Sequence, residues 1–321
     1  MAIFTYLSED KETRRSILSA KEEVLRMQAA EQKRRMVVGD IHGELEGFIE
    51  IIKNAGLIDD ECNWIGGSDI LIQTGDVIDR GPYSLEAVDL LKELQIKAAD
   101  AKGKVIRLCG NHELMILQKD FRYANFKNRE SFAAELKRDI LQGNVLASYT
   151  DGERLYTHAG LRSIIKDAIE DRGKANKHEL KSSKINLFGL SENINKIFRD
   201  CVENDSLAKH PIFHVGRDRG GSDPVGGIFW CDFSSVSNSE EAWLIPQVFG
   251  HTLTKKNEVK TAQGLSLIDV DAGMCRVYGG ERVYLEITSD GDLLQHSKVL
   301  LKWKTKLLGK MCCASSNADP H

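Results

Sequence analysis

The chain has 321 residues and a nearly balanced charge, with 44 Lys and Arg against 48 Asp and Glu. Apolar residues make up 41% and charged residues 29% of it, a composition typical of a globular protein rather than a disordered chain. The formal net charge of −4 does not favour nucleic acid as a partner. No stretch approaches the roughly 18–20 apolar residues that span a bilayer, so we predict no transmembrane segment.

The N-terminus and the cysteines favour a cytoplasmic location. Residues 1–11 have neither a basic segment nor a cleavage site of the kind found in signal peptides. The seven cysteines are scattered, odd in number and without a CxxC pair, so a disulfide framework is not expected. We expect a reducing compartment, while membrane tethering or secretion as an effector stays open.

Apolar runs alternate with helical stretches in the first third of the chain. Residues 36–38, 69–73 and 104–108 predict strands, and residues 44–55 and 84–99 predict helices. Each strand ends at a polar residue that follows a glycine, and these residues recur at intervals of 36 and 35 positions. Such an interval fits a strand–helix crossover, so we predict three neighbouring parallel strands with polar side chains at one edge.

The rest of the chain is less regular. Residues 120–220 read as mostly helical or irregular, except that Asp151-Gly152 predicts a hairpin between residues 145–149 and 154–157. Beyond Gly226 the sequence is rich in β-forming residues. There we expect strands at Gly227–Trp230, Gln247–Phe249, Leu265–Val270, Arg276–Tyr278 and Arg282–Ile287.

We divide the chain into an N-terminal helical extension (1–35), a catalytic domain (36–297) and a basic tail (298–321). The domain carries a helical insertion at about 161–210. The segment Lys298–Cys313 has five lysines, interleaved apolar residues and a terminal cysteine pair. We favour a solvated helix or strand there, with a weak membrane contact through acylated cysteine as the alternative.

Five short blocks combine Asp, Asn or His with glycine. They are GDIHG (39–43), GDVIDRG (75–81), GNHE (110–113), HAG (158–160) and FGHT (249–252). Glycine permits sharp turns at strand ends, and carboxylate, amide and imidazole donors suit Mn, Fe or Zn better than Ca. Six donors exceed what one ion needs, so we expect two ions that share a carboxylate, roughly 3.5–4 Å apart.

Together these blocks resemble the metallophosphoesterases, and specifically the PPP-type phosphoprotein phosphatases. The resemblance covers about residues 36–290. It implies an α/β fold of the calcineurin-like type, a central β-sandwich of mixed sheets flanked by helices. The segment Ile268–Gly280 replaces the SAPNYCG motif of the eukaryotic Ser/Thr core family, and is similar to the bacterial and Shewanella-like branches.

The resemblance also implies a ligand set for each ion. The first would be held by Asp40, His42 and Asp76, and the second by Asp76, Asn111, His158 and His251. Asp76 would thus bridge two divalent ions, with Mn favoured and Fe or Zn as alternatives. The cysteines stand outside this set, and we expect Cys109 to be a small core residue.

Three further residues are implied to act on the substrate. His112 would protonate the leaving oxygen, Asp79 would orient His112, and Arg80 would bind phosphate together with Asn111. A second phosphate-binding arginine is expected on the segment Gly226–Asp232, but Asp232 stands at its place.

Arg217 and Arg219 are both candidates for that second arginine. We expect Asp271 to shape a turn near the site rather than to bind metal.

The function expected from this resemblance is hydrolysis of phosphoserine and phosphothreonine in proteins by a metal-bridged hydroxide. The His112–Asp79 pair favours this reading, because a serine alkoxide is a poor leaving group. A phosphotyrosine-specific enzyme of the same fold, a dinucleoside tetraphosphate hydrolase and a scaffold without catalysis are the alternatives.

Overall fold

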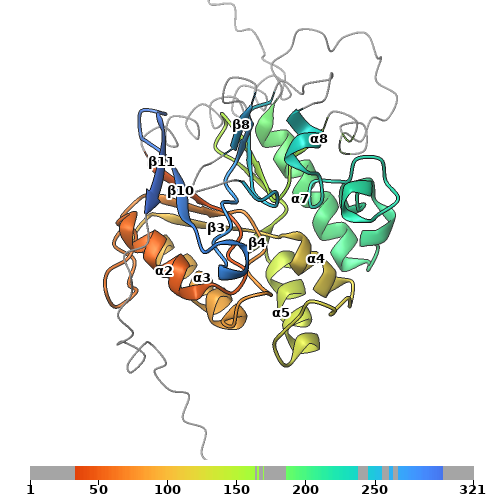
Figure 1. Ribbon diagram of the computed structural model, residues 1–321, viewed down its shortest axis with the longest axis horizontal. Coiled ribbons are helices and arrows are strands. Elements are labelled where there is room, and N and C mark those ends of the chain that lie inside the picture. The colour runs from red at the N-terminus through yellow and green to blue at the C-terminus, as the bar shows by residue number, and fades with distance from the viewer. Residues whose placement is uncertain are drawn as a thin grey trace, which may run out of the picture.

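The computed structural model describes residues 33–162, 165, 169, 186–237, 245–254, 260–262 and 267–298. Two β-sheets form its centre, and helices cover their outer sides (Figure 1). The expected N-terminal helix and the lysine-rich tail lie almost wholly outside the described residues, and so does most of the first half of the expected insertion.

The larger sheet has six strands in the order β11-β10-β1-β2-β3-β4. Strands β1 to β4 run parallel, and β10 and β11 complete the sheet in antiparallel fashion. The three neighbouring parallel strands predicted from the sequence are therefore confirmed. The strands are β1 (Arg35–Val38), β2 (Ile70–Gln73), β3 (Lys104–Leu108), β4 (Val145–Leu146), β10 (Arg282–Ile287) and β11 (Leu293–Lys298).

The smaller sheet has the order β5-β6-β7-β9-β8. Strands β6, β7 and β9 are parallel, and β5 and β8 flank them as antiparallel edges. The predicted Asp151-Gly152 hairpin is present as β5 and β6. The strands are β5 (Ser148–Thr150), β6 (Leu155–Thr157), β7 (Gln247–Phe249), β8 (Lys260–Ala262) and β9 (Leu267–Asp269).

Side chains along the central strands point alternately to the two faces of the larger sheet, so they contribute to two separate hydrophobic cores. Val37 and Ile72 point into the space between the sheets, where they pack with Tyr156 and Val248 of the smaller sheet. Met36, which precedes Val37 in β1, points to the opposite face and belongs to the core beneath the helices. Successive strand side chains point to opposite faces, so a strand buried on both faces is mostly apolar. Strands β1 and β2 are buried at every position, and Arg35 and Gln73 are their only polar residues.

Helices occupy both outer sides of the sandwich. Figure 1 shows α2 and α3 side by side, and α4, α5 and α7 as a second group. The α-helices are α2 (Leu45–Asn54), α3 (Ser84–Asp100), α4 (Asn111–Leu117), α5 (Arg129–Leu141), α7 (Leu187–Glu203) and α8 (Phe233–Ser237). Short 3₁₀ turns are η2 (Leu207–Lys209), η3 (Pro211–Phe213), η4 (Arg217–Arg219) and η5 (Arg276–Tyr278).

Two strand predictions were wrong. Residues 227–230 form a turn, because Gly226 has φ +81° and the Gly227 N–H donates to His214 O rather than to a strand. Residues 276–278 form η5, which ends at Gly279 with φ +129°. Both segments are β-forming in composition. Gly226-Gly227 at the start of the first and Gly279-Gly280 after the second turn the backbone away from strand pairing.

The predicted strand 145–149 is also divided. It leaves the larger sheet after β4 and enters the smaller sheet at β5. Where the chain passes from one sheet to the other, it is held by Asn195 of α7. The side-chain oxygen of Asn195 accepts the N–H groups of Ala147 and Ser148 at 2.9 and 3.1 Å. A distant side chain therefore decides where one strand stops.

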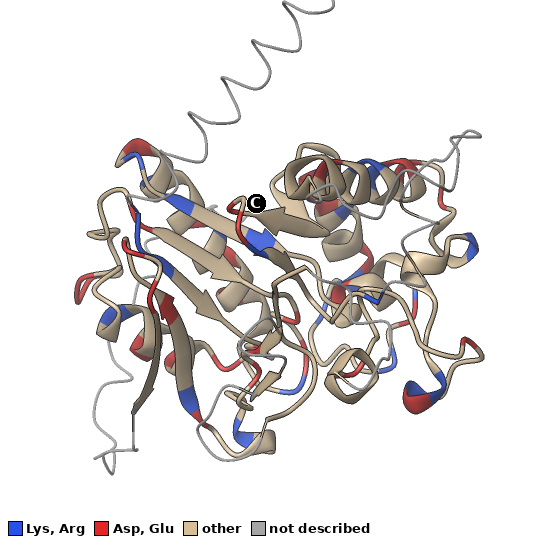
Figure 2. Ribbon diagram, turned by 90° about the horizontal axis from the view of Figure 1, so that it is seen from above, with Lys and Arg blue, Asp and Glu red and all other residues tan. Residues whose placement is uncertain are grey.

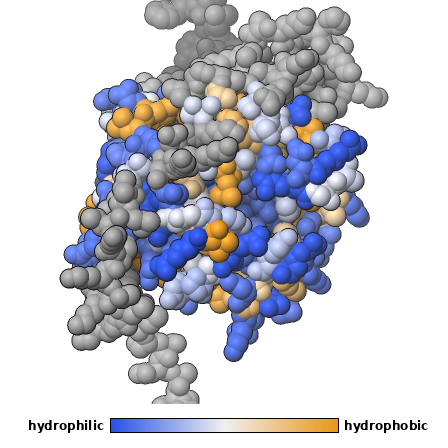
Figure 3. All heavy atoms as spheres, in the orientation of Figure 1, coloured by the Kyte–Doolittle hydropathy of each residue, from blue (hydrophilic) through white to orange (hydrophobic). Residues whose placement is uncertain are grey.

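Charged residues are distributed along the described chain (Figure 2), and apolar groups are dispersed on the one face that Figure 3 shows. Lys and Arg are interspersed with Asp and Glu along the ribbon (Figure 2), and the face drawn in Figure 3 is largely hydrophilic, with small separate apolar patches. Among the described helices, none has the length and apolar character needed to cross a membrane.

Candidate metal centre

The site lies where the strand ends of both sheets meet. Asp40 follows β1 and Asp76 follows β2, while Asn111 begins α4 directly after β3. The smaller sheet contributes His158 after β6 and His251 after β7. Asp40, Asp76, Asn111 and His251 line a cavity of about 630 Å³, and His158 contacts Asn111 behind it. All five side chains are buried. The polar side chains predicted at one edge of the larger sheet are therefore joined by histidines from the strand ends of the smaller sheet.

One group of donors lies around His42. Its Nε2 is 3.6 Å from Asp76 Oδ2 and 3.9 Å from Asp40 Oδ2. Its Nδ1 is 3.0 Å from the carbonyl oxygen of Ile78, which accepts a hydrogen bond from that nitrogen. This hydrogen bond fixes the tautomer in which Nε2 offers a lone pair toward the two carboxylates.

The second group converges on Asn111. Its side-chain oxygen lies 2.8 Å from His158 Nε2 and 2.9 Å from His251 Nδ1. His158 Nε2 is also 3.7 Å from Asp76 Oδ1, and its Nδ1 donates to Thr74 O at 2.9 Å. Asp76 thus directs one oxygen to each group, as a bridging ligand would.

This donor set fits two divalent cations. Ligands at about 2.1 Å from an ion lie roughly 3 Å apart, close to the separations within each group. Burial raises the pKa of Asp40 well above its usual range, and the carboxyls of Asp271 and Asp76 raise it further. Buried carboxylates this close need positive charge between them, which the ions would supply.

The imidazoles suit the same role. Burial lowers the pKa of His42 to about 4 and also lowers the pKa of His158 and His251. Neutral imidazoles offer lone pairs to a metal. The pKa of Asp76 is lowered despite burial, because His158, His112 and His42 lie around it.

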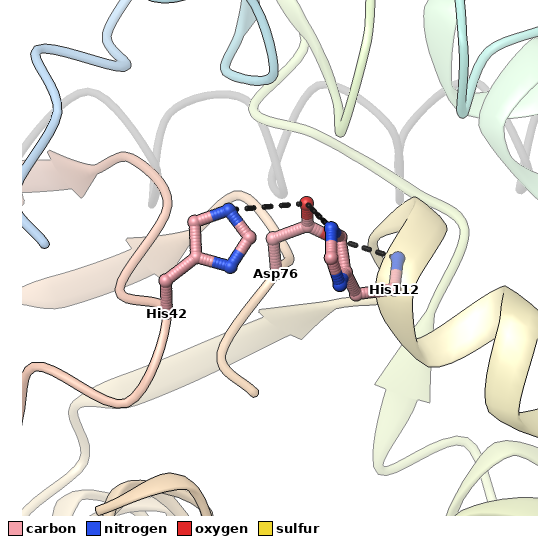
Figure 4. Close-up of side chains that lie close together, drawn as sticks. All are labelled: His42, Asp76 and His112. Carbon is pink, nitrogen blue, oxygen red and sulfur yellow. Dashed lines mark hydrogen bonds and ion pairs between the residues drawn. The ribbon is translucent and has the colours of Figure 1, made fainter. Parts of the chain in front are cut away.

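His112 lies beside the first group but is held differently (Figure 4). Its Nδ1 donates to Asp79 Oδ2 at 2.6 Å, and its Nε2 is 4.0 Å from Asp76 Oδ2. Burial lowers the pKa of His112, but Asp76 and Asp79 outweigh burial and raise it above its ordinary value. A proton on His112 is therefore favoured, as a general acid requires.

Arg80 is exposed at the cavity between two tyrosines. Its guanidinium carbon lies 4.4 Å from the ring centre of Tyr123, and its side chain hydrogen-bonds with Tyr278. Tyr123 also contacts His112, with ring centres 5.4 Å apart. The aromatic contacts hold the arginine over the site while leaving its fork open to an anion.

Several of these residues adopt left-handed backbone conformations. His42, Asp76, Asp79, Arg80 and His251 all have φ between +47° and +72°. A side chain makes this region costly, at about 1–3 kcal/mol per strained residue, and such strain concentrates at functional sites. Four of these side chains, those of His42, Asp76, Arg80 and His251, line one cavity, and Asp79 contacts His112 beside it.

Close approach of the loops requires glycine at two positions. A Cβ on Gly110 would lie 2.1 Å from Asp76 Oδ1, and one on Gly250 would lie 2.5 Å from Asp40 Oδ1. Both distances are far below contact distance. The glycines of the GNHE and FGHT blocks therefore leave room for the carboxylates of Asp76 and Asp40.

Glu113 is the residue whose role the sequence did not reveal. Its carboxylate is buried and accepts four backbone N–H groups, from Asp76, Val77, Ile78 and Gly110, at 2.8–3.3 Å. It thus ties the loop after β2 to the start of α4. Its place in the GNHE block, directly after His112, was the available indication.

Asp271 and the two candidate arginines also have defined places. Asp271 accepts the Gly273 N–H at 3.0 Å, which is the turn predicted for it, and it lines the cavity and hydrogen-bonds to Asp40. Arg219 lines the cavity, whereas Arg217 is not among its lining residues. Cys109 is fully buried in the core, as predicted.

The comparisons with known proteins agree with this arrangement. The family model described as calcineurin-like phosphoesterase matches residues 33–254, which include every strand-end block. The chain belongs to the calcineurin-like phosphoesterase family. The predicted fold and the predicted resemblance to PPP-type phosphatases are thereby confirmed.

Similarity to individual phosphatases is strongest in part of the chain. Shewanella-like protein phosphatase 2 of Arabidopsis thaliana is 41% identical over 114 residues, 36% of this chain and 29% of that protein. Serine/threonine-protein phosphatase PP1-1 of Saccharomyces cerevisiae is 33% identical over 133 residues, 40% of each chain. Each match spans less than half of the relative.

A solved structure extends the likeness to most of the fold. The cold-active protein-tyrosine phosphatase of a psychrophilic Shewanella species superimposes with a TM-score of 0.57 at 22% identity. The superposition covers 82% of this chain and 80% of that chain. It shows a shared fold.

Proposed function

We propose that the chain is a metal-dependent protein phosphatase that hydrolyses phosphoserine and phosphothreonine. The observation that supports this most is the His112–Asp79 pair at 2.6 Å, beside two donor groups that share Asp76. Family membership supports phosphoester hydrolysis, and the named phosphatases among the relatives support a phosphoprotein substrate.

The chain's own residues account for binding and proton transfer. Two bound divalent ions would supply a hydroxide nucleophile at neutral pH and offset the charge on the phosphoryl oxygens. Arg80 and Asn111 bind phosphoryl oxygens, and His112 Nε2 gives its proton to the leaving oxygen. Asp79 keeps Nδ1 protonated and stabilises the imidazolium before transfer.

We propose Mn as the resident metal, with Fe or Zn as alternatives. The donors are carboxylate and amide oxygens and neutral imidazoles, without thiolate. Nothing in the donor set requires a soft metal. We further propose a reducing, cytoplasmic setting, in line with the five free cysteines among the described residues.

Phosphotyrosine is the alternative substrate class, because a solved relative of the same fold bears the name of a tyrosine phosphatase. An aryl oxygen leaves without much help from an acid, whereas a serine alkoxide needs a proton. The intact acid pair therefore favours serine and threonine.

The test compares matched phosphoserine, phosphothreonine and phosphotyrosine peptides, with diadenosine tetraphosphate as a fourth substrate, each with Mn²⁺. We expect kcat/KM to be at least tenfold higher for the serine and threonine peptides. A preference for phosphotyrosine or for the dinucleotide would replace the proposal by the corresponding alternative.

A further inference from the structure

The mouth of the cavity carries exposed apolar side chains. Leu253, two residues after His251, is 44% exposed and lines the cavity, and Tyr123 is 41% exposed and lines it as well. The other non-aromatic apolar residues of the lining, Met115 and Val215, are buried or half-buried. Exposed apolar side chains at the rim of a polar cavity form a surface that a ligand can cover.

Leu253 packs beside Tyr278, which also lines the cavity. A Cβ placed on Gly273 would lie 3.2 Å from Leu253 Cδ2 and 3.1 Å from Tyr278 Cβ. Both side chains therefore lie against the same buried glycine, which leaves room for them. We refer to Leu253 and Tyr278 together as the apolar shelf.

Hydrogen bonds fix the backbone on both sides of the apolar shelf. Directly after the leucine, the Thr254 N–H donates to Asp271 O at 2.8 Å. The turn η5, which carries the tyrosine, is held by Arg282, whose Nη1 donates to Met274 O and Gly280 O at 2.9 Å each. The shelf is therefore ordered in advance, and little conformational entropy is lost when a ligand covers it.

Arg80 separates the apolar shelf from a charged part of the mouth. It hydrogen-bonds with Tyr278 of the shelf, and its guanidinium lies over the ring of Tyr123 from a different loop. Beside Tyr123, Asp120 and Arg122 form an ion pair at 2.6 Å, and both line the cavity. The two parts of the mouth therefore offer different surfaces to whatever extends from a phosphoryl group bound at Arg80.

A phosphopeptide has side chains that reach both parts of the mouth. The donor groups are buried, so a peptide whose phosphoryl group binds there must cross the mouth above them. Consecutive Cα atoms are about 3.8 Å apart, so the neighbours of the phosphorylated residue stay at the mouth. A cavity of about 630 Å³ has the size that receives a drug-sized ligand, far more than a phosphoryl group.

We propose that the apolar shelf determines substrate specificity by binding a large aliphatic side chain directly next to the phosphorylated residue. The inference deepens the proposed function and rests on it, because it names a sequence preference within the phosphoprotein substrates. An aliphatic side chain on the shelf removes its own apolar surface and that of Leu253 from water. A small polar side chain removes much less.

The experiment uses the Mn²⁺-loaded protein and phosphoserine peptides that differ only in having leucine or serine next to the phosphoserine, on either side of it. Burying part of a leucine side chain should raise kcat/KM about 5- to 30-fold for leucine at one of the two positions. The gain should appear in KM rather than kcat, because the contact is the same in the ground state and the transition state. Equal kcat/KM for all the peptides would overturn the proposal.

Leu253→Ser should remove the preference, leaving the leucine and serine peptides within twofold of each other. Its kcat/KM for the serine peptide and its affinity for inorganic phosphate should stay within twofold of wild type. Leu253→Met keeps an apolar side chain and should keep most of the preference. Equal losses on both peptides in Leu253→Ser would assign the leucine a merely structural role and overturn the proposal.

Leu294→Ser is the matched control. Leu294 is also 44% exposed, but it lies on β11 and does not line the cavity. This variant should keep the full preference for the leucine peptide. Loss of the preference in Leu294→Ser would show that the effect does not arise at the shelf.

Failure of the wider function is distinguishable from failure of this inference. If the wild-type protein hydrolyses no phosphopeptide, both fall. If it hydrolyses the peptides without a flanking preference, the inference falls and the proposed function stands. Hydrolysis of diadenosine tetraphosphate alone, weakened in Leu253→Ser, would assign the shelf to a nucleobase and overturn its role in peptide binding.

Discussion

Glu113→Gln should destabilise the protein and weaken its metal centre. The Glu113 carboxylate accepts the backbone N–H groups of Asp76 and Gly110 on one oxygen, and those of Val77 and Ile78 on the other. Glutamine offers one acceptor oxygen and an NH₂ donor in the same space. Whichever way the amide is oriented, two of the four N–H groups then face a donor.

The magnitude follows from that count. A buried donor left without an acceptor costs about 1–3 kcal/mol, so two of them cost about 2–6 kcal/mol. A domain is stable by about 5–15 kcal/mol, so the variant should still fold but with a clearly lower unfolding midpoint. Because the loop that carries Asp76 loses its support, Mn²⁺ affinity should also fall, by about 10- to 100-fold.

Urea unfolding of the metal-free protein gives the free energy of unfolding, and a metal titration gives the Mn²⁺ affinity. The matched control is Glu86→Gln on the exposed side of α3, which should change stability by less than about 0.5 kcal/mol. The reasoning is refuted if Glu113→Gln unfolds within 0.5 kcal/mol of wild type.

Three further outcomes are expected. His112→Asn should lower kcat on a phosphoserine peptide about 10²–10⁴-fold, and Asp79→Asn about 10- to 100-fold, with Mn²⁺ content retained; unchanged turnover would contradict both roles. Removing the metal with a chelator should lower the free energy of unfolding, because the ions offset buried carboxylates such as Asp40. Adding Mn²⁺ at 100 times its Kd should restore about 2.7 kcal/mol of that free energy. A Tm that does not depend on metal would contradict this. Gly110→Ala should lower Mn²⁺ affinity at least tenfold, because the new Cβ would lie 2.1 Å from Asp76 Oδ1; wild-type affinity, measured by titration, would show that the loops can separate freely.

The sequence predicted the elements whose pattern is local. Strand–helix spacing placed Asp40, Asp76 and Asn111 on one edge, because crossover length and parallel pairing follow from periodicity alone. The Asp151-Gly152 turn predicted its hairpin for the same reason. The joining of these three residues with His158 and His251 came from the family resemblance, since no local rule states how two sheets stack.

What the sequence missed depends on tertiary contacts. The ends of β4 and β5 are set by Asn195, some 50 residues further along the chain, which no window around Ala147 contains. The strands expected at 227–230 and 276–278 have β-forming side chains, but their glycines adopt positive φ and their N–H groups bond elsewhere. Local propensity was overruled there by backbone conformation.

The meeting of the two sheets has a consequence for folding. The His251 N–H donates to Asp40 Oδ1 across 211 positions of sequence. The second donor group joins Asp76 and Asn111 of the larger sheet to His158 and His251 of the smaller sheet, so it is complete only when the two sheets have docked. Closing a loop of that length is slow, and the complete two-ion site is not assembled before it closes. Bound metal should therefore leave the folding rate nearly unchanged and slow unfolding instead, so that it adds kinetic stability to the folded protein.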